Sequence, residues 1–206
     1  MGEFEGWTSW LEPAYLLWKP GGRGYERPSY MTRTEEDEPK LTPEQELEIM
    51  TKEVNDSDGF DIDFSSFLCV FNYHPAIFDS DLFADEESAT TEDFLNRLAH
   101  EALDGHNAKH GTEYEFVKVV KANYHFACAI MFLITFQVKD PYDDKIKLFQ
   151  TRVRQGRHIT TDFVFCRPKP NQGVEYFGIK KDSKRDIEEL VNKDVQKDVK
   201  KPKIGV

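Results

Sequence analysis

An α+β fold is the class that the sequence predicts, with one main helix packed on a four-stranded antiparallel sheet. Residues 92–107 place apolar side chains at helical spacing, which is typical of a helix that buries one face. Residues 114–166 then contain four runs with strand character and short connections, which favours an antiparallel meander. The 206 residues, 39% of them hydrophobic, suffice for one domain with appended segments.

The central strand is predicted from the apolar run 126–136, in which Thr135 is the one polar side chain. The run has no helical period, and a membrane-spanning helix needs about 20 apolar residues. It therefore indicates a buried strand. The other strands are expected at 114–123, 145–153 and 159–166. The expected core residues are Leu98, Ala102, Val117, Val119, Met131, either Leu133 or Ile134, and either Leu148 or Phe149.

The main helix is expected to begin after Thr90 or Thr91, either of which can cap it. Residues 41–91, before it, are predicted to form another helix and an extended acidic segment. Thr42 and Gln45 match a capping box, which opens this N-terminal helix. Alternation over 60–64 predicts a short strand after it.

The two ends of the chain differ in composition from its centre. Residues 1–40 contain an acidic run and all three tryptophans, Trp7, Trp10 and Trp18. They predict a flexible arm or, alternatively, a linear motif whose tryptophans anchor on a partner. Residues 171–206 form a charged tail, for which we expect a solvated helix or a nuclear import signal.

Charge and cysteine content restrict the function classes. The net charge of −11 argues against nucleic acid as a partner, because such affinity comes mainly from neutralising phosphates. The chain begins without a basic segment, so no secretory signal is expected, and neither is membrane association. Cys69, Cys128 and Cys166 are odd in number and are expected as free thiols, two of them in buried strands. These features together favour a cytoplasmic or nuclear protein.

Two sequence patterns resemble metal sites but lack the required ligands. With Gly59 at the sixth position of a calcium loop, Val54 falls where an oxygen ligand is needed and Ser65 where a bidentate Glu is needed. His106 and His110 lie four residues apart at a helix end, without a third ligand in register. No nucleophile-elbow pattern is present either. We therefore expect no metal, no cofactor, no catalytic residue and no enzymatic activity.

Three segments carry a resemblance to a known family. Residues 98–107 (LAHEALDGHN) resemble the helix signature LARFAVxEHN of plant cystatins. Residues 115–122 (EFVKVVKA) are similar to the family's first long strand, EFVRVVKA, and residues 131–140 (MFLITFQVKD) to its MYYLTLEAKD. The flanking segments resemble the plant cystatin-related proteins. The resemblance covers about residues 90–168 and implies a cystatin-like domain at 92–170.

That resemblance implies a wedge that enters the cleft of papain-like cysteine proteases. In the family the wedge consists of an N-terminal Gly, a QxVxG hairpin tip and a Pro-Trp second loop. Here the tip aligns with HFACA and the second loop with Gly-Arg-His, and no Gly stands just before the main helix. The expected degenerate first loop is His125, Phe126, Ala127, Cys128 and Ala129, and the second loop is Gly156, Arg157 and His158.

Two functional hypotheses follow. The first is a non-enzymatic protein-interaction module that presents these loops and its tryptophans to a protein partner. The alternative is an inhibitor of papain-like cysteine proteases with weak or altered specificity. The substitutions in the tip favour the first hypothesis, because Ala129 restricts the backbone freedom that glycine gives.

Overall fold

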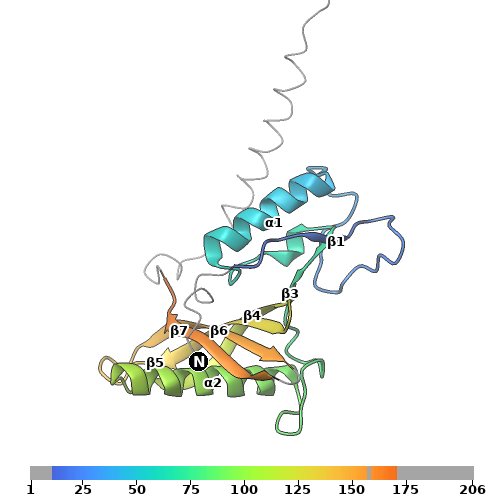
Figure 1. The fold of residues 1–206 in the computed structure, drawn as a ribbon. Helices are drawn as coiled ribbons and strands as arrows, with labels where there is room; N and C mark the ends of the chain where they lie inside the picture. Colours follow the sequence, from blue (N-terminus) through green and yellow to red (C-terminus); the bar gives the residue numbers. More distant parts are fainter. Residues whose placement is uncertain (1–10, 157–158, 171–206) are drawn as a thin grey trace, which may run out of the picture.

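The computed structural model describes residues 11–156 and 159–170 (Figure 1). Its helices are α1 (Pro43–Ser57) and α2 (Thr91–His110), with a short 3-10 helix at Phe64–Ser66. The strands are β1 (Leu16–Trp18), β2 (Val70–Phe71), β3 (Tyr73–Pro75), β4 (Glu115–Phe126), β5 (Ile130–Lys139), β6 (Ile146–Gly156) and β7 (Ile159–Pro168).

The main sheet is antiparallel and contains five strands in the order β3-β4-β5-β6-β7. The predicted α+β class and the meander are confirmed, and β5 pairs with its two sequence neighbours. The predicted number of four strands is wrong, because β3 adds an edge strand beside β4. β3 is three residues long and contains Pro75, so it lacks a recognisable strand pattern.

Both helices begin with capping boxes. The box at Thr42 is the one that the sequence predicts, and Thr90 is one of the two threonines expected to cap α2. Thr42 accepts a hydrogen bond from the backbone of Gln45, and Thr90 does the same for Asp93. α2 continues to His110, beyond the expected end, and Gly111 closes it in the left-handed conformation at φ 65°.

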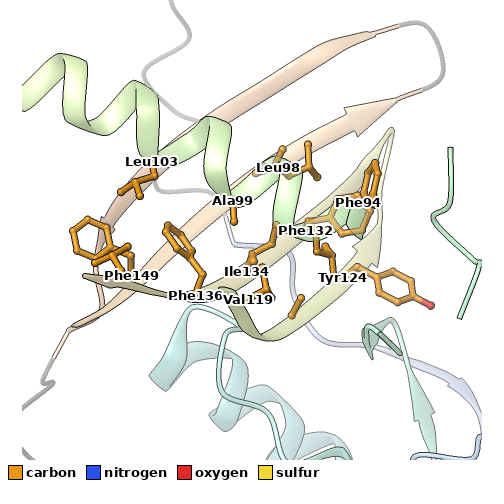
Figure 2. Close-up of a cluster of buried hydrophobic side chains, with 14 residues drawn as sticks. Phe94, Leu98, Ala99, Leu103, Val119, Tyr124, Phe132, Ile134, Phe136 and Phe149 are labelled. Atoms are coloured by element: carbon orange, nitrogen blue, oxygen red, sulfur yellow. The ribbon is translucent and has the colours of Figure 1, made fainter. Parts of the chain in front are cut away.

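One hydrophobic core lies between α2 and the sheet (Figure 2). Phe94, Leu98 and Leu103 of α2 contact the face of β5 that carries Phe132, Ile134 and other alternating residues. Of the paired expectations, Ile134 and Phe149 belong to this core. Val117 was wrongly expected in the core and is exposed, because a β-bulge near Phe116 shifts the facing of β4.

A second hydrophobic core covers the opposite face of the sheet. Leu133, which alternates with Phe132 and Ile134 along β5, packs there with residues of α1 and of the connection that follows α1. In Figure 1 α1 and α2 accordingly lie on opposite sides of the sheet. The members of this core are Ile49, Met50, Val54, Phe60, Ile62, Phe64, Phe67, Cys69, Phe71, Tyr73 and Leu133.

Residues 11–40 are packed against this second layer, in contrast to the flexible arm that their composition predicts. The side chain of Met31 is buried, and that of Arg33 donates to the carbonyl oxygens of Ser66 and Pro39. Tyr25 donates from its hydroxyl to the carbonyl oxygen of Leu68 over 2.8 Å. Buried apolar surface here offsets the entropy of ordering a polar segment.

The predicted strand at 60–64 is also wrong. Phe60, Ile62 and Phe64 are buried in the second core, but their segment forms a turn and enters the 3-10 helix. Asp58 and Gly59 cause the turn, since both adopt positive φ angles. The alternation therefore reports burial and not strand pairing.

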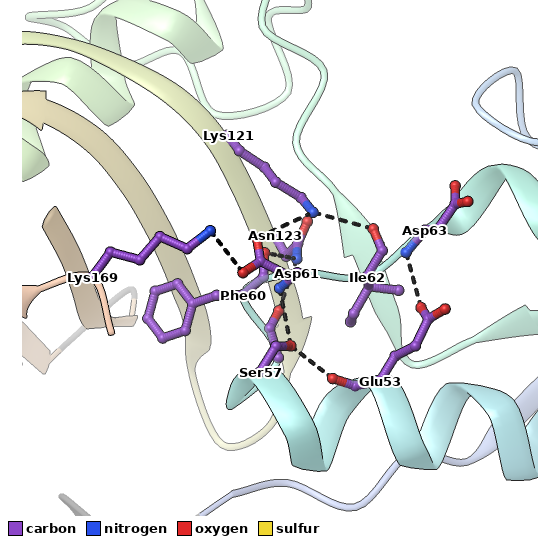
Figure 3. A network of polar contacts seen from close by, with 10 residues as sticks. Glu53, Ser57, Phe60, Asp61, Ile62, Asp63, Lys121, Asn123 and Lys169 are labelled. Atoms are coloured by element: carbon purple, nitrogen blue, oxygen red, sulfur yellow. Dashed lines mark hydrogen bonds and ion pairs between the residues drawn. The ribbon is translucent and has the colours of Figure 1, made fainter. Parts of the chain in front are cut away.

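A polar network joins the two layers beside this turn (Figure 3). Lys121 of β4 donates to the carbonyl oxygen of Ile62, and its ammonium lies 3.8 Å from the carboxylate of Asp61. Lys169 contacts the same carboxylate at 3.0 Å. Glu53 of α1 accepts a hydrogen bond from the backbone of Asp63. The acidic turn is thus neutralised by lysines from the sheet and its C-terminal end.

Candidate functional site

The strand ends that carry the two predicted loops lie at one end of the main sheet. Residues 127–129 connect β4 to β5, and residues 157–158 connect β6 to β7. Ile130 pairs with both Phe126 and Gln155, which places the strand ends that carry the loops side by side. The sheet thus brings together the strand ends that carry the two segments.

The first loop exposes its central residues. Phe126 is 54% exposed, and Ala127 and Cys128 are exposed as well. The backbone N–H of Ala127 donates to the carbonyl oxygen of Ala129 over 2.8 Å, which fixes the tight connection. The ring of Phe126 lies 5.6 Å from that of Tyr124 between centroids. The tip therefore presents a supported aromatic ring.

His125 is assigned to this loop by its sequence but is only 4% exposed. The centroid of its ring lies 4.9 Å from that of the Tyr73 ring, because β3 pairs with this end of β4 and sets Tyr73 beside His125. Burial, assisted by the positive charge of Arg152, lowers the pKa of His125 to about 4. The prediction that His125 contacts a partner is therefore wrong. Its ring is buried and packs against Tyr73 beneath the hairpin tip.

The second loop is described only at its edge. Gly156 is half-buried and ends β6, where it pairs with Ile159. Arg157 and His158 lie outside the described residues. The comparison of this loop with the Pro-Trp element therefore remains a sequence prediction.

Of the three predicted tryptophan anchors, the described residues include Trp18. It lies in β1, paired with Val70 in a separate two-stranded sheet, and is 47% exposed. Trp7 and Trp10 lie outside the described residues. Trp18 is therefore available to a partner, although in a different sheet from the hairpin loops.

The residues beside Trp18 were missed as candidates. Tyr15, Leu16 and Leu17 precede it, and all three are exposed. The signal was present in the sequence as four consecutive large apolar residues next to a proline and glycine cluster. Alternation alone could not identify their exposure, because β1 has only one strand partner in the described chain.

The cysteines and histidines show structural roles in the described part of the chain. Burial raises the pKa of the Cys69 and Cys166 thiols to about 12, so neither is a ready nucleophile. Cys128 is exposed, which corrects the expectation that it lies in a buried strand. Nδ1 of His106 lies 2.9 Å from the carbonyl oxygen of Cys166. The centroids of the His106 and His110 rings are 4.4 Å apart.

Within residues 11–156 and 159–170, no three His, Cys, Asp or Glu side chains gather in a way that would hold a metal ion. Neither helix in this part is both long and apolar enough to cross a membrane.

Comparison with known proteins adds no family assignment. No family model matches the chain, and no curated protein is significantly similar to it.

Proposed function

We propose that this chain is a non-enzymatic, cystatin-like protein that acts as a protein-interaction module. The observation that carries the proposal is the hairpin tip, where the exposed ring of Phe126 projects beside small residues while His125 is buried. Large aromatic side chains dominate the binding energy of protein interfaces. The helix packed on an antiparallel sheet supports the cystatin-like part of the proposal.

The tip differs from a protease-binding wedge in its chemistry. Ala127 offers less apolar area than valine, on the order of 1–1.5 kcal/mol in methylene bookkeeping. Ala129 carries a Cβ where the wedge uses glycine. An exposed phenylalanine is thus the largest apolar group at the tip, and we assign partner contact to Phe126.

The alternative function is weak inhibition of a papain-like cysteine protease. The shared location of the two hairpin loops favours it, since a wedge needs both at one edge. Under this alternative the two loops keep the shape of the wedge, and the affinity for the protease is reduced because the wedge side chains are replaced.

Inhibition kinetics with papain separate the two functions. We expect the wild-type chain to inhibit poorly. A variant with Ala127→Val, Ala129→Gly and a Pro-Trp pair in place of Arg157 and His158 should gain about ten- to a hundredfold for each restored element. Nanomolar inhibition by the wild-type chain would make it an inhibitor and overturn the interaction module.

Capture of partners from the source tissue tests the role of Phe126. We expect Phe126→Ala to lose a partner that the wild-type chain retains. The matched control is Tyr142→Ala, because Tyr142 is 79% exposed and lies in the turn at the opposite end of the sheet. Equal capture by both variants would contradict a binding site at the tip.

A further inference from the structure

A groove of about 380 Å³ lies between α2 and β7, away from the hairpin tips. One wall is the outer side of α2 from Glu101 to His110, and the other is the apolar segment Phe163–Cys166 of β7. Its position and its lining differ from those of the hairpin loops, so it is a separate candidate surface.

β7 is an edge strand whose centre carries no charged side chain and no proline. A β-bulge lies there, since Arg152 pairs with Phe165 and Val153 with Phe163. β7 pairs with β6 on one side and has no strand on the other side among the described residues. Natural edge strands carry charges or prolines that prevent pairing with other chains. Here Asp162 and the Arg167–Pro168 pair flank four uncharged, half-buried residues at 163–166. One carbonyl oxygen, that of Cys166, is occupied by His106.

The α2 wall carries an ordered pattern of charge and space. Glu101, Gly105 and Lys109 follow one another at intervals of four residues and so lie along one side of the helix. A Cβ built on Gly105 meets no atom within 4 Å. Glu101 and Lys109 enter no ion pair within the described part of the chain. Along α2 this wall therefore presents a negative charge at Glu101, open space at Gly105 and a positive charge at Lys109.

Gly105 has no structural requirement at its position. It lies inside α2, where glycine costs about 1 kcal/mol relative to alanine, and it does not adopt a positive φ. A Cβ there would be free of clashes. Its absence keeps the middle of the groove open.

We propose that this groove binds an extended peptide segment of a partner protein, which pairs with the edge of β7 and turns complementary side chains toward α2. The peptide carries a basic residue beside Glu101, a large apolar residue over Gly105 and an acidic residue beside Lys109. Main-chain pairing supplies affinity in this mode, and alternate side chains supply specificity.

The spacing of the helix sets the spacing of the peptide. Glu101 and Lys109 are eight positions apart along α2, a rise of about 12 Å. Four residues of extended chain span about 13 Å and return to the same face of the strand. The matching pattern is thus a basic residue, any residue, a large apolar residue, any residue and an acidic residue.

Synthetic peptides of about seven residues test the proposal with the full-length protein. The first has lysine, leucine and glutamate at alternate positions with threonine between them. The second replaces the lysine and the glutamate by glutamine, and the third replaces the leucine by alanine. We expect the first to bind roughly tenfold more tightly than either of the others, as measured by amide chemical-shift titration. The shifts should map to residues 101–110 and 163–168.

Variants of the groove wall provide the second arm. Gly105→Leu fills the open middle and is favourable for the helix, so it should fold and lose binding at least tenfold. Asp104→Leu adds the same side chain at an exposed neighbour outside the groove and should bind normally. Glu101→Gln combined with Lys109→Gln should remove the preference of the protein for the first peptide over the second.

Three outcomes overturn the proposal. The first is equal binding of all three peptides, or shifts confined to residues 126–130. The second is self-association of the protein that Gly105→Leu abolishes, because a second copy then fills the groove. The third is binding only after removal of residues 171–206, because the chain's own tail then competes. These results do not depend on partner binding at Phe126, so a failure of the proposed function would leave them unchanged.

Discussion

The side-chain amide of Asn123 donates a hydrogen bond of 2.8 Å to the carbonyl oxygen of Gly59 and one of 3.1 Å to that of Phe60. Asn123 is completely buried in β4, whereas both acceptors belong to the turn that follows α1. One side chain therefore satisfies two carbonyl groups of the second layer and fixes that layer on the sheet.

Asn123→Ala should reduce the free energy of unfolding by about 1–3 kcal/mol, because it leaves both carbonyl oxygens without this donor. Urea denaturation measures the change. Asn55→Ala, at an exposed position of α1, is the control and should stay within about 0.5 kcal/mol of the wild-type protein. Equal stabilities of the two variants would mean that the layers do not depend on Asn123.

Gly59→Ala should be among the most destabilising single substitutions in the chain. Gly59 has φ 78°, and an added Cβ would lie 2.8 Å from Cδ1 of Leu133. We expect a loss of about 1–2 kcal/mol from the left-handed backbone and about 1–3 kcal/mol from overpacking. Gly111→Ala shares the positive φ but meets no neighbouring atom, so it should show the backbone cost alone. Urea denaturation of both variants separates the two effects, and equal losses would contradict the close contact.

The extent to which the sequence predicts this fold depends on whether its signals are local. The capping boxes at Thr42 and Thr90 fix both helix starts, since their hydrogen bonds span only three residues. The hairpin tip is less visible. Residues 127–129 lie inside the apolar run 126–136, so nothing in hydrophobicity separates the loop from β5.

The second layer could not be predicted from local patterns. Met31 and Arg33 are buried although they lie in a polar, proline-containing segment. Arg33 bonds to Ser65 and Ser66, more than thirty positions away. The burial of His125 likewise depends on Tyr73, which pairs with it from a distant strand. The loop location followed from family resemblance, whereas the facing of individual side chains required the structure.

Glu53 should make the protein less stable as the pH rises. Burial raises its pKa to about 7, against the lowering effects of the Asp63 backbone N–H, Lys121 and Lys52, while the carboxylate of Asp63 raises it further. The unfolded chain has a Glu pKa of about 4.3, so the folded state binds more protons between these values. Stability from this group is complete below pH about 4.3 and is lost by pH about 7.

Glu53→Gln keeps an acceptor for Asp63 and removes the titration. Its free energy of unfolding should therefore gain on the wild-type value as the pH rises from 4 to 7, by up to about 1.4 kcal/mol per pH unit. Urea denaturation across this range measures the difference. A constant difference between the two proteins would show that Glu53 does not titrate in this window.

His125 should have the opposite dependence. Its folded pKa of about 4 lies below the value of about 6.5 in the unfolded chain, so the unfolded state binds the extra proton between them. Stability from this group is present above pH about 6.5 and is lost as the pH falls toward 4. His125→Gln should abolish that loss in thermal melts, whereas the exposed control His100→Gln should retain it. Parallel pH profiles of His125→Gln and the wild-type protein would refute the buried neutral ring.

Met31 tests whether residues 11–40 belong to the folded unit. Its side chain is 5% exposed although it lies in a segment whose composition predicts flexibility. Truncation of a buried methionine to alanine costs about 2–5 kcal/mol, because both transfer energy and packing are lost. Met31→Ala should therefore lower the urea midpoint clearly, and trypsin should cut the variant faster than the wild-type protein within residues 23–33. Glu36→Ala, exposed in the same segment, should leave both measurements unchanged. If the two variants behave alike and wild-type residues 23–33 are cut at once, this segment is a free arm and its packing contributes nothing to stability.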